Sequence, residues 1–116
     1  MHTGSCHCGT VKFEVDAGAG PDKVLECNCS HCSRKGLLLW FVPREALKTT
    51  AGEDQLETYT FNKKVIEHQF CPTCGVQPYS FGTMPDGTKM AAINTRCLEG
   101  FDLENVERKP INGREF

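Results

Sequence analysis

Cysteine is the feature that most limits how this chain can fold. Eight of its 116 residues are cysteines, and seven of them fall into three short clusters, while Cys97 stands alone. Cysteine at this density is typical of a disulfide framework, a metal site or thiol chemistry. The three clusters are Cys6-x-Cys8, Cys27-x-Cys29-x-x-Cys32 and Cys71-x-x-Cys74.

The first residues contain no charged start followed by an apolar run, so the sequence predicts no secretory signal peptide. No apolar stretch approaches the roughly 20 residues that a membrane-spanning helix needs. We therefore expect a cytoplasmic protein without membrane contact, where disulfides are rare and clustered cysteines are metal ligands or reactive thiols. Structural disulfides remain the alternative. The net charge of −2 leaves no broad basic surface, so we expect no nucleic-acid partner.

Short apolar or alternating runs separated by turn residues predict a mainly β fold with little helix. The expected strands cover residues 11–15, 37–42, 56–61, 64–70, 77–81 and 89–94, with a helical turn at 43–47 and a hairpin turn at 85–87. We expect the polar tail, residues 99–116, to be mostly irregular. A β domain of this size buries a limited core, and metal-bound cysteines would stabilise it.

The first and third clusters look like two halves of one structural zinc site. Zinc prefers tetrahedral sulfur and nitrogen ligation. A glycine follows both Cys6-x-Cys8 and Cys71-x-x-Cys74, and glycine permits the positive φ that such turns often need. Joining the pairs closes a long loop, which restricts the unfolded chain. The alternative, four unrelated buried cysteines, does not call for paired turns with glycines.

The middle cluster places Cys27, Cys29 and Cys32 within six residues. Three protein ligands with one open position are typical of a catalytic zinc, and four of a structural zinc. Three thiolates would give the zinc centre a formal charge of −1, which suits holding another thiol better than activating water. Two alternatives stay open. His31 or Cys97 could supply a fourth ligand, or the three thiols could form a redox group without metal.

These motifs together resemble the glutathione-dependent formaldehyde-activating enzyme family, which includes centromere protein V. The resemblance rests on the three clusters in this order and on two further segments, GEDQLETY at residues 52–59 and NTRCLEG at 94–100. It extends over about residues 4–103, so we expect one domain of this type over residues 1–116.

The resemblance implies an Mss4-like fold of several small coiled antiparallel sheets held by zinc. It implies two zinc ions per chain: a structural ion held by Cys6, Cys8, Cys71 and Cys74, and a labile catalytic ion held by Cys27, Cys29 and Cys32. The implied activity is that of a carbon–sulfur lyase acting on a thiol–aldehyde adduct such as S-hydroxymethylglutathione, with glutathione as the thiol. The alternatives are a non-catalytic zinc- or glutathione-binding module and a scaffold with two structural zinc ions.

A few residues near the clusters are candidates for contact with an anionic thiol. Arg96 could bind a carboxylate in a bidentate pair, although an internal ion pair is the commoner role. The neighbouring cations Arg34 and Lys35 follow Cys32 closely. His31 could orient a ligand or shuttle a proton, but we expect it to be an exposed loop histidine.

Overall fold

β-Strands dominate the computed structural model, which describes residues 1–60 and 66–112. The mainly β prediction is therefore confirmed. The strands are β1 (His2–Ser5), β2 (Lys12–Val15), β3 (Lys23–Cys27), β4 (Leu39–Pro43), β5 (Leu47–Ala51), β6 (Glu57–Tyr59), β7 (Glu67–Phe70), β8 (Tyr79–Thr83), β9 (Lys89–Asn94) and β10 (Glu107–Ile111). The helical elements are α1 (Ser30–Lys35) and the single 3-10 turns η1 (Arg44–Ala46), η2 (Glu53–Gln55) and η3 (Thr95–Cys97).

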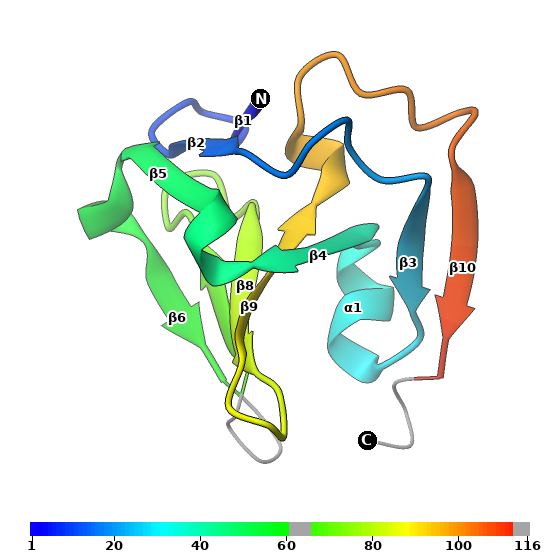
Figure 1. Ribbon diagram of the computed structural model, residues 1–116. Coiled ribbons are helices and arrows are strands. Elements are labelled where there is room, and N and C mark those ends of the chain that lie inside the picture. Colours follow the sequence, from blue (N-terminus) through cyan, green and yellow to red (C-terminus); the bar gives the residue numbers. More distant parts are fainter. Residues whose placement is uncertain (61–65, 113–116) are drawn as a thin grey trace.

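The strands form two sheets. The smaller one has the order β1-β2-β5 and is antiparallel throughout. The larger one has the order β10-β3-β4-β9-β8-β7-β6 and is mixed, because β10 pairs with β3 in parallel. Figure 1 shows β10 and β6 at opposite edges of this sheet, with α1 beside β3. Several small antiparallel sheets were expected; the described strands form two sheets, of which the larger is mixed.

The predicted strands appear where the alternation or the turn chemistry is clear. In β2, Phe13 and Val15 are buried while Lys12 is exposed. Between β8 and β9 the chain turns at Pro85-Asp86-Gly87, where the Asp86 carboxylate accepts a hydrogen bond from the Thr88 N–H at 2.9 Å. Gly87 has a φ of 91°, a conformation that glycine adopts without strain.

Some expectations were wrong or lie partly outside the described residues. The tail is not irregular throughout, because β10 lies in it and pairs Ile111 with Cys27. The predicted strand over residues 37–42 begins at Leu39, although Leu37 and Leu38 are also buried. The strands expected over 56–61 and 64–70 are observed as β6 and β7, and residues 61–65 lie outside the described part of the chain.

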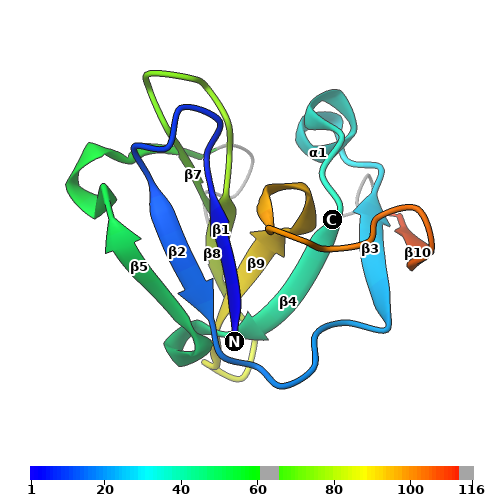
Figure 2. The same cartoon turned by 90° about the horizontal axis from the view of Figure 1, so that it is seen from above.

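The main core is built from both sheets. Its fully buried members include Phe13 of β2, Tyr79 of β8 and Ile93 of β9. The rings of Phe13 and Tyr79 meet edge to face with their centroids 5.5 Å apart, an arrangement that aromatic pairs favour. Figure 2 shows the smaller sheet lying across strands of the larger one. No helix in the described ranges is long and apolar enough to span a membrane.

Candidate metal centres and the groove between them

Four sulfur atoms from the first and third cysteine clusters meet at one place. The Sγ atoms of Cys6, Cys8, Cys71 and Cys74 all lie within 4.8 Å of one another. The distances are 3.7 Å from Cys6 to Cys8 and 3.6 Å from Cys8 to Cys71. Four sulfurs bonded to one zinc ion at about 2.3 Å would lie about 3.8 Å apart, whereas a disulfide needs about 2.05 Å. This donor set therefore fits a zinc ion, and we call it the four-cysteine centre.

Two tight turns build the four-cysteine centre. In the first, the Cys6 N–H donates to the Val11 carbonyl at 3.0 Å, and the Val11 N–H donates to Cys6 Sγ at 3.4 Å. In the second, the Cys71 N–H donates to the Val76 carbonyl at 3.0 Å, and the Gly75 N–H donates to the Cys71 carbonyl at 2.7 Å. Cys6, Val11 and Cys71 are all buried and pack together in a small core cluster. Hydrogen bonds within each turn therefore fix the backbone of its own cysteines.

The thiols of the four-cysteine centre differ in pKa: burial raises the pKa of Cys6, whereas hydrogen bonds to Thr10 lower that of Cys8. Burial raises the pKa of Cys74, but the backbone N–H groups of Cys8 and Val76 and the neighbouring thiols of Cys71 and Cys6 outweigh it, so the pKa falls to about 6. The thiolate is the form that binds metal. The lowered pKa of Cys74 therefore favours its role as a metal ligand.

The second cluster forms a separate group at the start of α1. The Sγ atoms of Cys27, Cys29 and Cys32 lie within 4.8 Å of one another, and we call them the three-cysteine centre. Among the described histidine, cysteine and acidic residues, no fourth side chain joins this group, so neither His31 nor Cys97 closes it. All eight cysteines lie in the described residues and all are free thiols, so the disulfide framework is not formed.

The ends of β3 and α1 position the three-cysteine centre. Cys27 ends β3, Cys29 precedes the helix as its N-cap, and Cys32 is buried within it. The Cys32 N–H donates to Cys29 Sγ at 3.3 Å, a capping interaction that cysteine supplies here in place of serine or aspartate. Gly36 ends the helix with a φ of 66°, in the left-handed conformation that is common after a last helical turn.

The surroundings of the three thiols shift their pKa values in different directions. Burial raises the pKa of Cys32 and of Cys27. Burial also raises the pKa of Cys29, but the N–H groups of Cys32 and His31 and the other two thiols outweigh it, so the net shift is downward. Cys29 is therefore the sulfur of this centre that most readily carries negative charge.

Two cavities lie between the centres. The first, of about 740 Å³, is lined by Ser30, His31, Arg34, Lys35, Tyr59, Phe70 and Gly75. The second, of about 560 Å³, is lined by Ser5, His7, Lys35, Leu37, Gly75, Val76, Gln77, Asn94, Arg96 and Cys97. Because Lys35 and Gly75 line both, we treat the two cavities together and call them the Lys35 groove.

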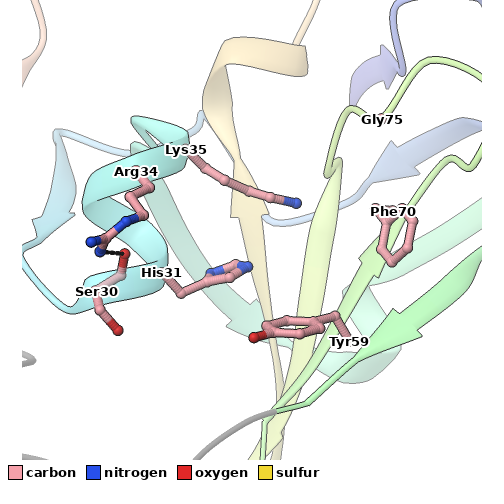
Figure 3. A pocket seen from close by; sticks show the side chains of 7 residues that line it. All are labelled: Ser30, His31, Arg34, Lys35, Tyr59, Phe70 and Gly75. Atoms are coloured by element: carbon pink, nitrogen blue, oxygen red, sulfur yellow. Dashed lines mark hydrogen bonds between the residues drawn. The ribbon is translucent and has the colours of Figure 1, made fainter.

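Lys35 reaches from α1 across the first cavity. Figure 3 shows its ammonium group directed away from the helix toward the side of the cavity that carries Phe70. Its Nζ donates to Gln77 Oε1 at 3.2 Å and lies 5.5 Å from the centroid of the Phe70 ring. Burial lowers the pKa of Lys35, because its charge is partly removed from water. Lys35 is thus an exposed lysine whose ammonium group has two defined contacts.

The other two cations of the groove are held by backbone carbonyls. Arg34 turns back along α1, and its Nη1 donates to the Ser30 carbonyl at 2.9 Å (Figure 3). Arg96 donates from Nε to the Gly36 carbonyl at 2.8 Å. The expected internal ion pair of Arg96 is thus replaced by a bond to the end of α1, which fixes its guanidinium at the second cavity.

Aromatic rings form one wall of the first cavity. The His31 ring lies 5.6 Å from that of Tyr59, stacked at an interplanar angle of 17°, and 3.9 Å from that of His68. His68 is buried, and its Nδ1 lies 3.2 Å from Gln77 Nε2. The prediction that His31 is an exposed loop histidine was therefore wrong, because the ring is half-buried in this stack.

Tyr59, His68 and Gln77 are the contributors that sequence reasoning missed. They lie in or next to β6, β7 and β8. The available signals are that Tyr59 ends the GEDQLETY segment and that His68 and Gln77 flank the Cys71-x-x-Cys74 cluster closely. Cys97 is partly buried at the edge of the second cavity. Burial and, to a lesser degree, the nearby thiols of Cys6 and Cys74 raise its pKa to about 12.

Comparisons with known proteins agree with this arrangement. A crystal structure of a Rhodobacter sphaeroides protein superposes with a TM-score of 0.78 at 29% sequence identity, covering 92% of this chain and 99% of that one. A sequence model of the family described as glutathione-dependent formaldehyde-activating enzyme matches residues 1–111. That match takes in both cysteine centres and every strand described above. The chain therefore belongs to the glutathione-dependent formaldehyde-activating enzyme family.

Proposed function

We propose that this protein is a zinc-dependent carbon–sulfur lyase-like enzyme that acts on a thiol–aldehyde adduct such as S-hydroxymethylglutathione. The observation that carries the proposal is the three-cysteine centre, where three sulfurs converge and no fourth ligand joins them among the described residues. Three protein ligands leave a tetrahedral zinc one position for a substrate atom. Membership of a glutathione-dependent family supports a thiol as the substrate.

The two centres would have different roles. Cys6, Cys8, Cys71 and Cys74 would hold a structural zinc ion that joins the two ends of the fold. Cys27, Cys29 and Cys32 would hold a second, labile ion. Zinc bound there would supply a site that keeps a substrate thiol in its thiolate form.

The reaction balances without a redox partner. In the synthetic direction the thiolate sulfur attacks the aldehyde carbon, a carbon–sulfur bond forms, and the carbonyl oxygen takes up a proton. In the reverse direction the hydroxyl proton leaves, the carbon–sulfur bond breaks, and aldehyde and thiolate are released. The chain has to position sulfur and aldehyde together and exclude competing water. The half-buried ring of His31 and the buried Leu37 and Leu39 restrict water near the three-cysteine centre.

A second candidate function is a non-catalytic zinc- or glutathione-binding module. One observation favours it: none of the three sulfur-bearing residues lines either cavity of the Lys35 groove, and Cys32 is only 6% exposed. In that case the ligand would bind in the groove without bringing its sulfur to an open metal position.

Exchange spectroscopy separates the two functions. The rate at which glutathione and formaldehyde exchange with their adduct is measured by NMR, with and without the zinc-loaded protein, because the reaction also proceeds unaided. The lyase proposal expects faster exchange that is lost in Cys29→Ala and kept in Lys48→Gln, a variant outside both centres and both cavities. Exchange at the spontaneous rate, combined with measurable glutathione binding, would favour the binding module.

The proposal includes a cytoplasmic location and a single domain. A cytoplasmic location fits seven clustered free thiols, since a reducing environment keeps them available to metal. We also infer that residues 1–116 act as one zinc-binding domain. The strand order supports this, because β4 and β9, from different parts of the chain, lie between β3, which ends at Cys27, and β7, which precedes Cys71.

A further inference from the structure

The Lys35 groove carries charge of one sign. Its charged lining residues are Arg34, Lys35 and Arg96, and no aspartate or glutamate from residues 1–60 or 66–112 lines either cavity. The whole chain has a net charge of −2. Three cations gathered on one concave surface of an acidic protein therefore point to an anionic ligand.

The negative charge of the two cysteine centres is a second reason for cations in the groove. With zinc bound, four thiolates would give the four-cysteine centre a formal charge of −2, and three would give the three-cysteine centre −1. An anion entering between them would be repelled unless cations faced it. Lys35 and Arg96 lie in the groove between these centres, each fixed by a hydrogen bond from its charged group.

The lining also suggests what kind of anion fits. Lys35 lines both cavities and Arg96 lines the second, so the groove offers two cations that come from different parts of the chain. Tyr59 and Phe70 offer ring surface in the first cavity (Figure 3). Arg96 uses Nε on the Gly36 carbonyl, which leaves its terminal nitrogens Nη1 and Nη2 directed elsewhere. An extended small molecule with two acidic groups suits such a surface better than a single inorganic anion does.

We propose that Lys35 and Arg96 determine substrate specificity by binding the two carboxylates of an extended, peptide-like thiol, one carboxylate each. The identity of the ligand as substrate rests on the proposed function, but the carboxylate contacts do not require the three-cysteine centre to hold metal. Lys35 would form a charge-assisted hydrogen bond, and Arg96 a paired contact through its terminal nitrogens. Ser30 and His31, which line the first cavity, lie in sequence between Cys29 and Cys32, so the groove shares a helical turn with the three-cysteine centre.

The test uses S-methylglutathione, which keeps both carboxylates and has no free thiol to ligate metal. Its affinity for the zinc-loaded protein is measured by calorimetry, and again after a mild chelator has removed the labile ion. We expect similar affinity in both states, weakened about five-fold or more by Lys35→Gln and by Arg96→Gln. Lys48→Gln is the matched control, because Lys48 is an exposed lysine of β5 outside both cavities.

A ligand without the charges gives a second measure. The diamide of S-methylglutathione should bind the wild-type protein more weakly and should show no further loss with Lys35→Gln. Raising the salt concentration should weaken the binding of S-methylglutathione but not the binding of the diamide, because salt screens exposed charges. Arg96→Lys keeps the charge and loses the paired contact, so its affinity should fall between those of the wild-type protein and Arg96→Gln.

Three outcomes would overturn the proposal. The first is that Lys35→Gln and Arg96→Gln bind S-methylglutathione as well as Lys48→Gln does. The second is that these variants lose zinc but keep ligand affinity, which would mean that the cations only offset the charge of the centres. The third is no binding to the wild-type protein at millimolar concentration. Binding without faster adduct exchange would instead contradict the lyase activity and leave the groove assignment standing.

Discussion

The Sγ atoms of Cys8 and Cys71 lie 3.6 Å apart, although 63 positions separate the two residues in the chain. This contact joins the turn after β1 to the turn after β7. Both turns are short, and a metal shared by four sulfurs at this point would cross-link the end of β7 in the larger sheet to the end of β1 in the smaller one.

Replacing one ligand of the four-cysteine centre should unfold the domain. In Cys71→Ala, three ligands remain and the buried site is left with a gap, so we expect loss of one zinc per chain and a fall in melting temperature of at least about 10 °C. Metal content and thermal unfolding followed by circular dichroism measure the two effects. A variant that keeps the wild-type melting temperature would show that this centre does not stabilise the fold.

Replacing one thiol of the three-cysteine centre should remove one zinc ion without unfolding the domain. Cys27 is half-buried at the end of β3, and its loss removes a ligand but no part of the main core. We expect Cys27→Ala to contain one zinc instead of two, with a melting temperature within a few degrees of the wild-type value. Cys97→Ala should keep both ions. Loss of both ions, or global unfolding of Cys27→Ala, would argue that this centre is structural.

Gly52 is a position where only glycine fits. It has a φ of 76°, and a Cβ atom added there would overlap the carbonyl oxygen of Thr10. Gly87 also has a positive φ, of 91°, but a Cβ there would meet open space. We expect Gly87→Ala to cost about 1 kcal/mol of unfolding free energy and Gly52→Ala at least about twice as much. Equal costs in urea unfolding would show that the Thr10 turn relaxes to make room.

His68 should make stability depend on pH. Burial, together with the charges of His31 and Lys35, lowers its pKa from 6.5 to about 4. Between these values the unfolded chain binds a proton that the folded protein does not, so the unfolding free energy is full above pH 6.5 and falls as the pH drops to 4. We expect a shallower fall in His68→Gln.

The matched control for that measurement is His7→Gln, because His7 is exposed. Acid also releases zinc from thiolates, but this effect is common to all three proteins and cancels when their slopes are compared. Identical slopes for His68→Gln and the wild-type protein would contradict the prediction.

The C-terminal strand β10 should slow the release of zinc from the three-cysteine centre. The Asn28 N–H donates to the Ile111 carbonyl at 3.1 Å, and Asn28 Nδ2 donates to Asn112 Oδ1 at 3.1 Å. Removing residues 107–116 would free the loop between Cys27 and Cys29. We expect the labile zinc to pass to a chelator several-fold faster, and Asn112→Ala to give a smaller increase. The ion of the four-cysteine centre should leave at the wild-type rate in both proteins.

The sequence predicted best those parts that short-range patterns control. Alternation identifies β2 through Phe13 and Val15, and turn chemistry identifies the hairpin at Asp86. The spacing and the flanking glycines predict that Cys6 and Cys8 group with Cys71 and Cys74, and the structure places these sulfurs together. Their role as ligands stays a prediction, as does that of Cys27, Cys29 and Cys32.

The remaining elements depend on contacts that the sequence does not encode locally. The segment Glu107–Ile111 is polar, and four of its five residues are exposed, so it shows no alternation. It becomes a strand because β3 offers it backbone partners, and as an edge strand it can include Pro110. Helix α1 is too short for helical periodicity to show. The groove escaped prediction because Lys35, Gln77 and Arg96 come together only in the folded chain.

The short pairing between β3 and β4 has a consequence for local opening of the protein. These strands are in register at one pair, Leu25 with Leu39, whereas β4 and β9 pair over five residues. We therefore expect the segment formed by β10, β3 and α1 to open at a lower free-energy cost than the rest of the sheet. Its amides should exchange with solvent before those of β8 and β9. An ion could then enter or leave the three-cysteine centre by a local opening, while the rest of the protein stays folded.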